Sequence, residues 1–306
     1  MKIKKIVFAG MFLIAGLTVT SAQVKLSFNP EKGKKYEYQT DMTQNIQQKV
    51  MGQTIPMELE MNIKYLMEIK NKTPQEITVQ FTYREVVYII TSPMMKMGYD
   101  SKNPIENPSE MDKILGKMFS KMIDQSLVAV IEPDGTIKSV TGMDAVAENM
   151  VKAIAEDGQL SGQVMAAQLS EQMKQQFNDD AMKISFQHSF KIYPANAVKA
   201  GDSWNEESAM SVNNMNTTYI TKYTLKEVKN NMATVAVESV VAMDPGATME
   251  GKLDGTQNGT ILVDVKTGLP VTNDITMNIK GNVKTQGMDI EMDLSAQTKT
   301  TTKEIK

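Results

Sequence analysis

Cysteine is absent from the 306-residue sequence, and histidine occurs once, as His188. Without cysteine the chain cannot form disulfides, thiolate metal sites or a cysteine nucleophile. A lone histidine also excludes the usual zinc sites, which need three or four histidine or cysteine ligands. Neither a GxSxG elbow nor a GxGxxG or GxxxxGK[ST] phosphate loop occurs. We therefore expect a non-catalytic protein without a cofactor, with a hydrolase that uses carboxylates as the remaining enzyme hypothesis.

Arginine is almost absent too, because Arg84 is the only one in a chain of net charge −3. No stripe of basic residues with interleaved aromatic residues appears, so nucleic acid is not an expected partner. Beyond the first 22 residues no apolar run approaches the roughly 20 residues that a membrane-spanning helix needs. The chain is therefore not expected to span a membrane.

Residues 1–22 have the order of a signal peptide, with a basic start, an apolar run from Ile6 to Val19 and small residues before Gln23. The absence of cysteine leaves no lipoprotein attachment site. We expect cleavage near Ala22 and a mature protein that is soluble, either periplasmic or secreted.

The remaining chain, 23–306, reads as a single α+β domain. Period-two hydrophobic alternation predicts hairpin blocks at 23–100 and 182–306, which flank a helical middle at 107–178. The expected strands are 35–50, 55–70, 77–90, 127–142 (a short hairpin), 182–193, 207–229, 232–243, 259–266, 269–286 and 288–303. Residues 92–108 and 244–258 are predicted to be loops.

Apolar residues at three- and four-residue spacing predict helices at 107–125, 143–156 and 162–178. Asn107 as the cap, Pro108 in the first turn and Glu110 form a coherent start for the first helix. Strands of about 15 residues imply a large twisted sheet that curls. The predicted fold is a large curved antiparallel sheet, of which a half-barrel is one form, with three central helices packed on its concave face.

A short internal sequence repeat occurs in the two strand blocks. Residues 41–61 align without a gap with residues 274–294, and the identical pairs include Asp41/Asp274, Asn45/Asn278 and Glu58/Glu291. Chance recurrence of hairpin patterning is one explanation. A duplicated hairpin is the other, and we prefer it because the apolar phase is also retained.

Methionine is the one residue in excess: of 26 in the sequence, Met1 and Met11 fall in the predicted signal, which leaves 24. Most of them fall singly on predicted apolar faces, where a filled core is the simplest interpretation. Because methionine adapts to variable apolar partners, a groove between sheet and helices is the alternative. The candidate residues for binding an apolar ligand are Met57, Met61, Met118, Met122, Met150 and His188.

Two further site hypotheses come from the same residues. Met94, Met95 and Met97 resemble the clustered thioethers of copper(I) sites, and they are a weak copper candidate. His188 falls on the apolar face of the strand predicted at 182–193, where it is either a hydrogen-bonded core residue or a ligand contact.

Several phrases resemble, in order and over nearly the whole mature chain, a family of exported Bacteroidota proteins classed as a domain of unknown function. They are "FNPEKGKKYEYQTDMTQNI", "GYDSKNP", "AVIEPDGTIKSVTGMDAV", "YPANAVKAGDSWNEE" and "GTILVDVKTGLPVTNDITMNIKG". The resemblance implies one exported unit with no assigned catalytic residues. The family has no activity to lend, so the methionine-lined faces provide the functional expectation: an envelope protein that binds an apolar small molecule, a lipid or an envelope protein. A structural or protein-interaction protein with a closed core is the alternative.

Overall fold

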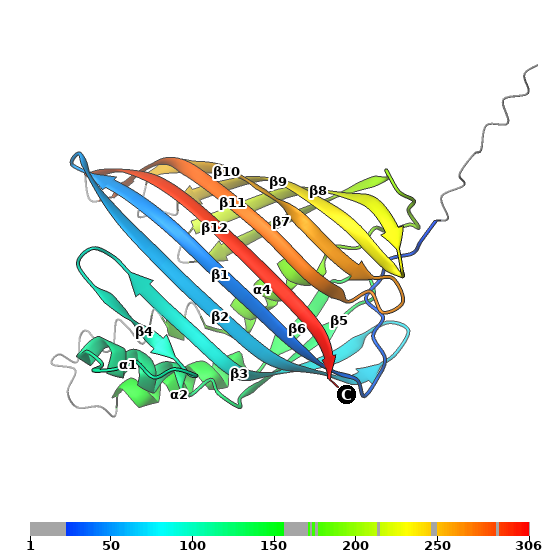
Figure 1. Cartoon of the computed structure of the whole chain (residues 1–306), viewed down its shortest axis with the longest axis horizontal. Coiled ribbons are helices and arrows are strands. Elements are labelled where there is room, and N and C mark those ends of the chain that lie inside the picture. Colours follow the sequence, from blue (N-terminus) through cyan, green and yellow to red (C-terminus); the bar gives the residue numbers. More distant parts are fainter. Residues whose placement is uncertain are drawn as a thin grey trace, which may run out of the picture.

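The computed structural model describes residues 23–155, 171, 173–174, 177–212, 215–245, 250–285 and 288–305. These residues form a large, curved, mostly antiparallel sheet of 12 strands together with three helices (Figure 1). The strands are β1 Lys35–Val50, β2 Gln53–Lys72, β3 Ile77–Thr91, β4 Lys96–Asp100, β5 Ser126–Ile131, β6 Ile137–Thr141, β7 Ser203–Val212, β8 Met215–Lys229, β9 Met232–Pro245, β10 Glu250–Asp264, β11 Pro270–Thr285 and β12 Met288–Ile305. The helices are α1 Glu110–Phe119, α2 Met143–Ala155 and α4 Asp179–Phe190.

The sheet is open in the part of the chain that the structure describes. Its strand order is β6-β5-β3-β2-β1-β12-β11-β10-β9-β8-β7, and β4 pairs with β3 beside this path. β6 and β7 are therefore the edge strands at the two ends of this path. The first and last strands of the sequence, β1 and β12, pair along their length at the centre of the sheet.

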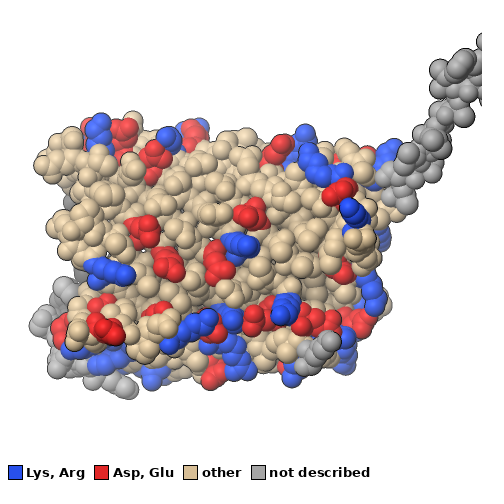
Figure 2. Space-filling model, viewed as in Figure 1, with Lys and Arg blue, Asp and Glu red and all other residues tan. Residues whose placement is uncertain are grey.

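The two faces of the sheet differ in chemistry. Along β1, Tyr36 and Tyr38 point to the concave face and are buried, while the alternate residues Glu37 and Gln39 point outward. Figure 2 shows scattered acidic and basic side chains among uncharged residues on the outer face. The apolar residues of the long strands thus converge on the inside of the curve.

Glycines on β10 allow the sheet to bend. A Cβ atom at Gly255 would lie 2.1 Å from the Asn278 carbonyl oxygen of β11, and one at Gly259 would lie 2.1 Å from that of Asp274. Only glycine permits so close an approach between neighbouring strands. The prediction of a loop at 244–258 was therefore wrong from residue 250 onward, because these glycines are strand residues and not turn residues.

Helix α4 is the main correction to the sequence-based fold. Residues 182–193 were predicted to be a strand, but Asp179–Phe190 is helical. The Asn178 side chain caps it by accepting a hydrogen bond from the Ala181 amide at 2.8 Å, and acidic residues follow in the first turn, as the helix dipole favours. The apolar residues Phe186 and Phe190 are four apart, so they lie on one face of the helix.

Two phenylalanines attach α4 to the concave face. The Phe186 ring lies 4.6 Å from that of Phe81 on β3, and the Phe190 ring lies 6.2 Å from that of Tyr38 on β1. Burying each phenylalanine stabilises the fold by about 1.5–3 kcal/mol. In Figure 1, α4 lies behind β1 and β12, inside the curve of the sheet.

The residues at the end of α4 also connect both edges of the sheet. The Gln187 Oε1 atom accepts a hydrogen bond from the amide of Ile137 on β6 at 2.8 Å. Just beyond the helix, the Ile192 carbonyl accepts one from the Trp204 indole on β7 at 3.1 Å. This short segment therefore ties the two edge strands together.

The first two helices lie near the β3–β4 hairpin. The Phe119 ring of α1 is 5.1 Å from that of Tyr88 on β3, and the Tyr83 hydroxyl of β3 contacts the Met143 sulfur of α2 at 3.7 Å. α2 ends within one residue of its prediction, but α1 is shorter. The N-terminal cap of α1 is Ser109, which forms a capping box with Asp112. The predicted helix start, with Asn107 as the cap and Glu110 three residues later, was wrong.

The observed secondary structure also differs from the predicted one in where some strands are interrupted and where they begin and end. The predicted loop at 92–108 contains β4, and the strand predicted at 207–229 is the β7–β8 pair. The helix predicted at 162–178 lies almost wholly outside the described residues. No helix in the described ranges is both long and apolar enough to cross a membrane.

The two repeated segments form adjacent hairpins. Residues 41–61 lie on β1–β2 and residues 274–294 lie on β11–β12, and β1 pairs with β12. The last pair before the turn is Val50–Gln53 in one hairpin and Thr285–Met288 in the other. The gapless alignment matches Val50 with residue 283, so the second turn comes two residues later. Because strand side chains alternate with a period of two, a shift of two residues leaves each side chain on the same face of the sheet.

Replacing Gln187 with methionine tests the link between α4 and the edge strand. Methionine keeps the chain length of the side chain but cannot accept the Ile137 amide, and Ile137 is 2% exposed. Leaving that amide unpaired costs about 1–3 kcal/mol. We expect urea denaturation to show this loss for Gln187→Met, whereas Gln47→Met, at an exposed position on β1, changes stability by less than about 0.5 kcal/mol. Equal stability of both variants would contradict the link.

Candidate binding cavity

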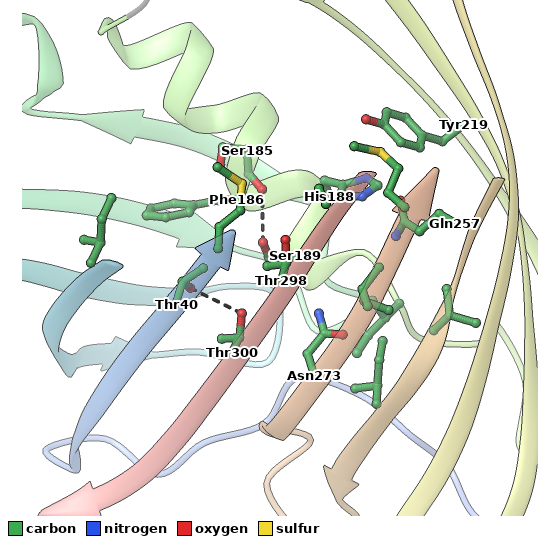
Figure 3. Close-up of a pocket in the computed structure, with 18 of the residues that line it drawn as sticks. Thr40, Ser185, Phe186, His188, Ser189, Tyr219, Gln257, Asn273, Thr298 and Thr300 are labelled. Carbon is green, nitrogen blue, oxygen red and sulfur yellow. Dashed lines mark hydrogen bonds between the residues drawn. The ribbon is translucent and has the colours of Figure 1, made fainter. Parts of the chain in front are cut away.

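A cavity of about 320 Å³ lies between α4 and the concave face of the sheet. Residues of α4 form one side, and residues of β1, β2 and β7–β12 form the other. Figure 3 shows the α4 side chains Ser185, Phe186, His188 and Ser189 facing the strands across this space. The curvature of the sheet and the anchoring of α4 at its end thus leave room beside the helix.

Most of the lining is apolar. The methionines, aliphatic residues and aromatic rings come from elements far apart in the sequence, so the cavity exists only in the folded sheet. The apolar lining residues are Met42, Met61, Ile63, Met182, Phe186, Ile192, Met210, Val237, Ile261, Ile275, Met277 and Ala296. Such a surface favours an apolar ligand.

A polar row crosses the floor of the cavity on three neighbouring strands. Asn273 on β11 stands opposite Thr300 on β12, and Thr300 stands opposite Thr40 on β1. The Thr40 and Thr300 hydroxyls are 3.2 Å apart and hydrogen bonded (Figure 3). The same row continues into Ile261 on one side and Ile63 on the other. The row is therefore a short polar patch bounded by aliphatic side chains.

Asn273 has a side-chain oxygen atom without a hydrogen-bond partner. Its Oδ1 atom is buried and has no partner among the described residues. Buried polar atoms without a partner are rare in folded proteins, because each costs about 1–3 kcal/mol. Asn273 itself is one of the residues that line the cavity.

His188 lies on α4 between the cavity and β8. Its ring centroid is 4.6 Å from that of Tyr219, and the side chain is half-buried. Burial lowers the pKa of His188, and a hydrogen bond with Gln257 on β10 partly opposes this. His188 is therefore neutral at neutral pH. The correction from strand to helix changes which residues are its neighbours but leaves it facing the inside.

The tyrosines around the cavity are also uncharged. Burial raises the pKa of Tyr38, and hydrogen bonds from hydroxyls that include those of Thr40 and Thr300 oppose it. Burial also raises the pKa of Tyr65 and Tyr219. The described lining residues include no Lys, Arg, Asp or Glu. The cavity is therefore electrically neutral at neutral pH.

The predicted site residues divide into three groups. Met61 and His188 line the cavity. Met118, Met122 and Met150 are buried in the core of the fold, with 0–2% of each side chain exposed. Met57 lies on β2, four residues from Met61 towards the hairpin turn, and is not among the lining residues.

Sequence reasoning missed the polar residues of the cavity. Asn273, Thr298 and Thr300 share the inward phase of their strands with apolar residues, and polar residues at an inward phase were the available signal. Met182 was missed as a helix residue because its segment was predicted to be a strand.

The weak copper candidate occupies the turn between β3 and β4. The Ser92 amide bonds to the Met95 carbonyl there at 2.8 Å, and Met94 and Met95 are 88% and 55% exposed, while Met97 is on β4. Within the described ranges, no group of three histidine, aspartate or glutamate residues could hold a metal ion.

A second cavity of about 310 Å³ adjoins the first on the β7 side of α4. His188 and Tyr223 line both, and Lys191, Glu206 and Glu207 line the second one. Burial raises the pKa of Glu206, while Lys191 lowers it. Glu206 and Glu207 are successive residues of β7, so their side chains point to opposite faces of the strand.

A model of a family of unknown function (DUF6263) matches residues 74–270. The chain belongs to this family. The matched DUF6263 region includes α4 and β7–β10, whereas β1, β2 and β12 lie outside it. The predicted membership of a family of unknown function is confirmed at this level. No curated protein matches the sequence significantly.

Similar solved structures include a structure titled "Lipid-protein interactions in lipovitellin", with 10% identity and a TM-score of 0.44 over 89% of this chain. This chain spans only 25% of that one. An outer membrane channel from Pseudomonas putida F1 has 6% identity and a TM-score of 0.26, over 90% of this chain and 96% of the other. OccK7 (OpdD) of Pseudomonas aeruginosa has 7% identity and a TM-score of 0.20, over 90% and 100%. Likeness at this level establishes neither a shared ligand nor a shared activity.

The pKa of His188 provides a test of its burial. The unfolded chain takes up a proton near pH 6.5, whereas the folded chain does so only at lower pH. The free energy of unfolding should therefore fall as the pH drops from about 6.5 to the folded pKa, and His188→Gln should remove this dependence. Because His188 is the only histidine, an NMR titration of untagged protein reports its pKa without assignment. A pKa at or above 6.5 would contradict the burial.

Proposed function

We propose that this protein is a non-catalytic, exported envelope protein that holds an apolar small molecule between α4 and the concave face of the sheet. The observation that supports this most directly is the cavity of about 320 Å³ with its largely apolar lining. In this proposal the central helices cover the concave face, and α4 is the helix that leaves a binding space.

The size of the cavity suits a ligand better than a packing defect. Native interiors are close-packed, and their few voids are small. An engineered apolar cavity of about 150 Å³ binds benzene. The present cavity, at about 320 Å³, is roughly twice as large, and it reaches the lower end of the range for ligand pockets.

The rival hypothesis, a structural or protein-interaction protein with a closed core, draws support from a different part of the molecule. Around α1 and α2 the core is filled, since Met118, Met122 and Met150 are buried. The space beside α4 is what favours ligand binding over this alternative. A lipid is therefore a candidate ligand, and an envelope protein is the alternative partner.

A carboxylate-based hydrolase is the third hypothesis and has less support. General acid and base catalysis by two carboxylates needs both groups to flank one reacting bond. None of the described residues that line the main cavity is acidic. Glu206 and Glu207 both line the second cavity, but as successive strand residues their side chains point to opposite faces. The predicted acidic groups Glu58/Glu60 and Asp289/Glu291/Asp293 lie on β2 and β12 at positions that point outward.

Filling the cavity should abolish binding. Ala296 lines it from β12, so Ala296→Phe places a ring in the proposed ligand space. We expect the affinity for the neutral fluorescent probe N-phenyl-1-naphthylamine to fall by about tenfold or more, which corresponds to 1.4 kcal/mol. Probe fluorescence in a titration with purified protein measures the affinity.

The matched control is Gln297→Phe, which adds the same ring to the exposed outer face one residue along β12. It should bind the probe as the unsubstituted protein does. Thermal unfolding of both variants checks that the fold is retained. If the protein does not bind the probe, or if Ala296→Phe binds it unchanged, the cavity is not the binding site.

Export is part of the proposal and has its own test. The basic start, apolar run and small-residue end of residues 1–22 support cleavage before Gln23. We expect the intact mass of protein recovered from the periplasm or medium of the native cell to correspond to a chain that begins at Gln23. Recovery of the uncleaved chain from the cytoplasm would contradict export.

A further inference from the structure

The polar patch and the charge balance of the cavity indicate which class of apolar molecule it would accept. This inference rests on the proposed function, because it concerns the ligand of the same cavity. It depends on three observations: the unpaired Asn273 acceptor, the position of the Asn273–Thr300–Thr40 row, and the absence of charged groups among the described lining residues.

A charged headgroup would have no partner in this cavity. The described lining residues contain no lysine or arginine. Lys191, just beyond α4, lines the second cavity and is engaged by the Asp134 carboxylate and by Thr136 at 2.9 Å. Burying an ionised carboxylate without a counter-charge costs far more than burying a neutral polar group. A fatty acid anion is therefore disfavoured.

The polar row contains a hydrogen-bond acceptor that lacks a donor. The Thr40 and Thr300 hydroxyls bond to each other and to the Tyr38 hydroxyl. The Asn273 Oδ1 atom next to them is buried, accepts from nothing in the described chain, and belongs to a residue that lines the cavity. A ligand hydroxyl or amide N–H placed there would satisfy it, whereas a carboxylate or ketone oxygen would repel it.

The surroundings of the row also set the orientation of the ligand. Ile261 and Ile63 flank it along the row, and Ile275 and Met277 follow Asn273 on the inward face of β11. A molecule whose donor lies at Asn273 therefore has aliphatic and methionine side chains around the rest of its length. Methionine side chains adapt to chains of different shape.

We propose that the cavity selects an uncharged apolar molecule with one hydrogen-bond donor, of the class of long-chain alcohols, and that Asn273 accepts the hydrogen bond from that donor. Asn273 is then a specificity-determining residue. The apolar walls supply most of the affinity, and the Asn273 contact distinguishes an alcohol from a hydrocarbon or an acid of the same length.

Competition against N-phenyl-1-naphthylamine tests this selectivity. At pH 7.5, 1-decanol should displace the probe at a concentration about tenfold or more below that needed for decanoate. Equal displacement by the two, or stronger displacement by decanoate, would overturn the inference while leaving the proposed function intact. If neither competes and the probe itself does not bind, the proposed function fails instead.

Asn273→Leu tests the residue. The variant removes the acceptor and should weaken displacement of the probe by 1-decanol about 3- to 10-fold, as expected for one hydrogen bond, while displacement by decane, which has no hydrogen-bond donor, changes by less than about twofold. Asn278→Leu, the same change at an exposed position on the outer face of β11, should alter neither.

Stability distinguishes a binding role for Asn273 from a structural one. Since its acceptor is unpaired in the free protein, Asn273→Leu should leave the melting temperature of the ligand-free chain unchanged or raise it. A large drop in melting temperature, or an unchanged affinity for 1-decanol, would show that Asn273 serves the fold and not the ligand. Asn273→Ala gives a second measurement if the leucine side chain blocks the cavity.

Discussion

The attachment of α4 and the residues after it to both edge strands is the constraint on which the rest of the structure depends. An open curved sheet has two unpaired edges, and unpaired backbone groups at an edge invite unwanted pairing. Here Gln187 accepts the Ile137 amide of β6, and the Ile192 carbonyl accepts the Trp204 indole of β7. One short segment therefore fixes the distance between the edges, and with it the curvature of the strands between them.

The cavity follows from the same attachment. The helix is anchored by Phe186 and Phe190 near its C-terminal end, where Phe81 and Tyr38 receive them. The curved strands continue beyond these contacts, so a gap remains beside Met182, Ser185 and His188. A helix held along its whole length would close this space. Binding capacity and fold stability thus come from different residues of one helix.

The sequence predicted the sheet better than the site. Long alternating stretches such as those of β1, β2 and β12 identify strands because period two persists over many residues. The α4 segment was predicted to be a strand because its residue spacing fits both a strand and a helix. Ile184, Phe186, His188 and Phe190 occur at every second position, as in a strand, while Phe186 and Phe190 are also four apart, as on one face of a helix. The capping sequence Asn178-Asp179-Asp180 favoured a helix and was the deciding local signal.

The site could not be derived in the same way, because its residues are brought together by strand register. Met61 and His188 were identified from their apolar surroundings, and both line the cavity. Asn273 meets Thr300 and Thr40 only through the pairing of β11, β12 and β1, and no local pattern encodes that register. Met118, Met122 and Met150 were chosen from apolar helix faces, a feature that residues of a filled core share, and all three are buried in the core.

Two glycines of β10 hold a fixed part of the sheet beside the cavity. Any side chain at Gly255 or Gly259 would collide with the backbone of β11, so these two positions cannot be used to enlarge or narrow the space. Changes in ligand size must instead come from positions such as Ala296, Val237 and Met182, where side chains already face the cavity. Proteins that share this sheet could therefore differ in ligand while keeping the glycines of β10 unchanged.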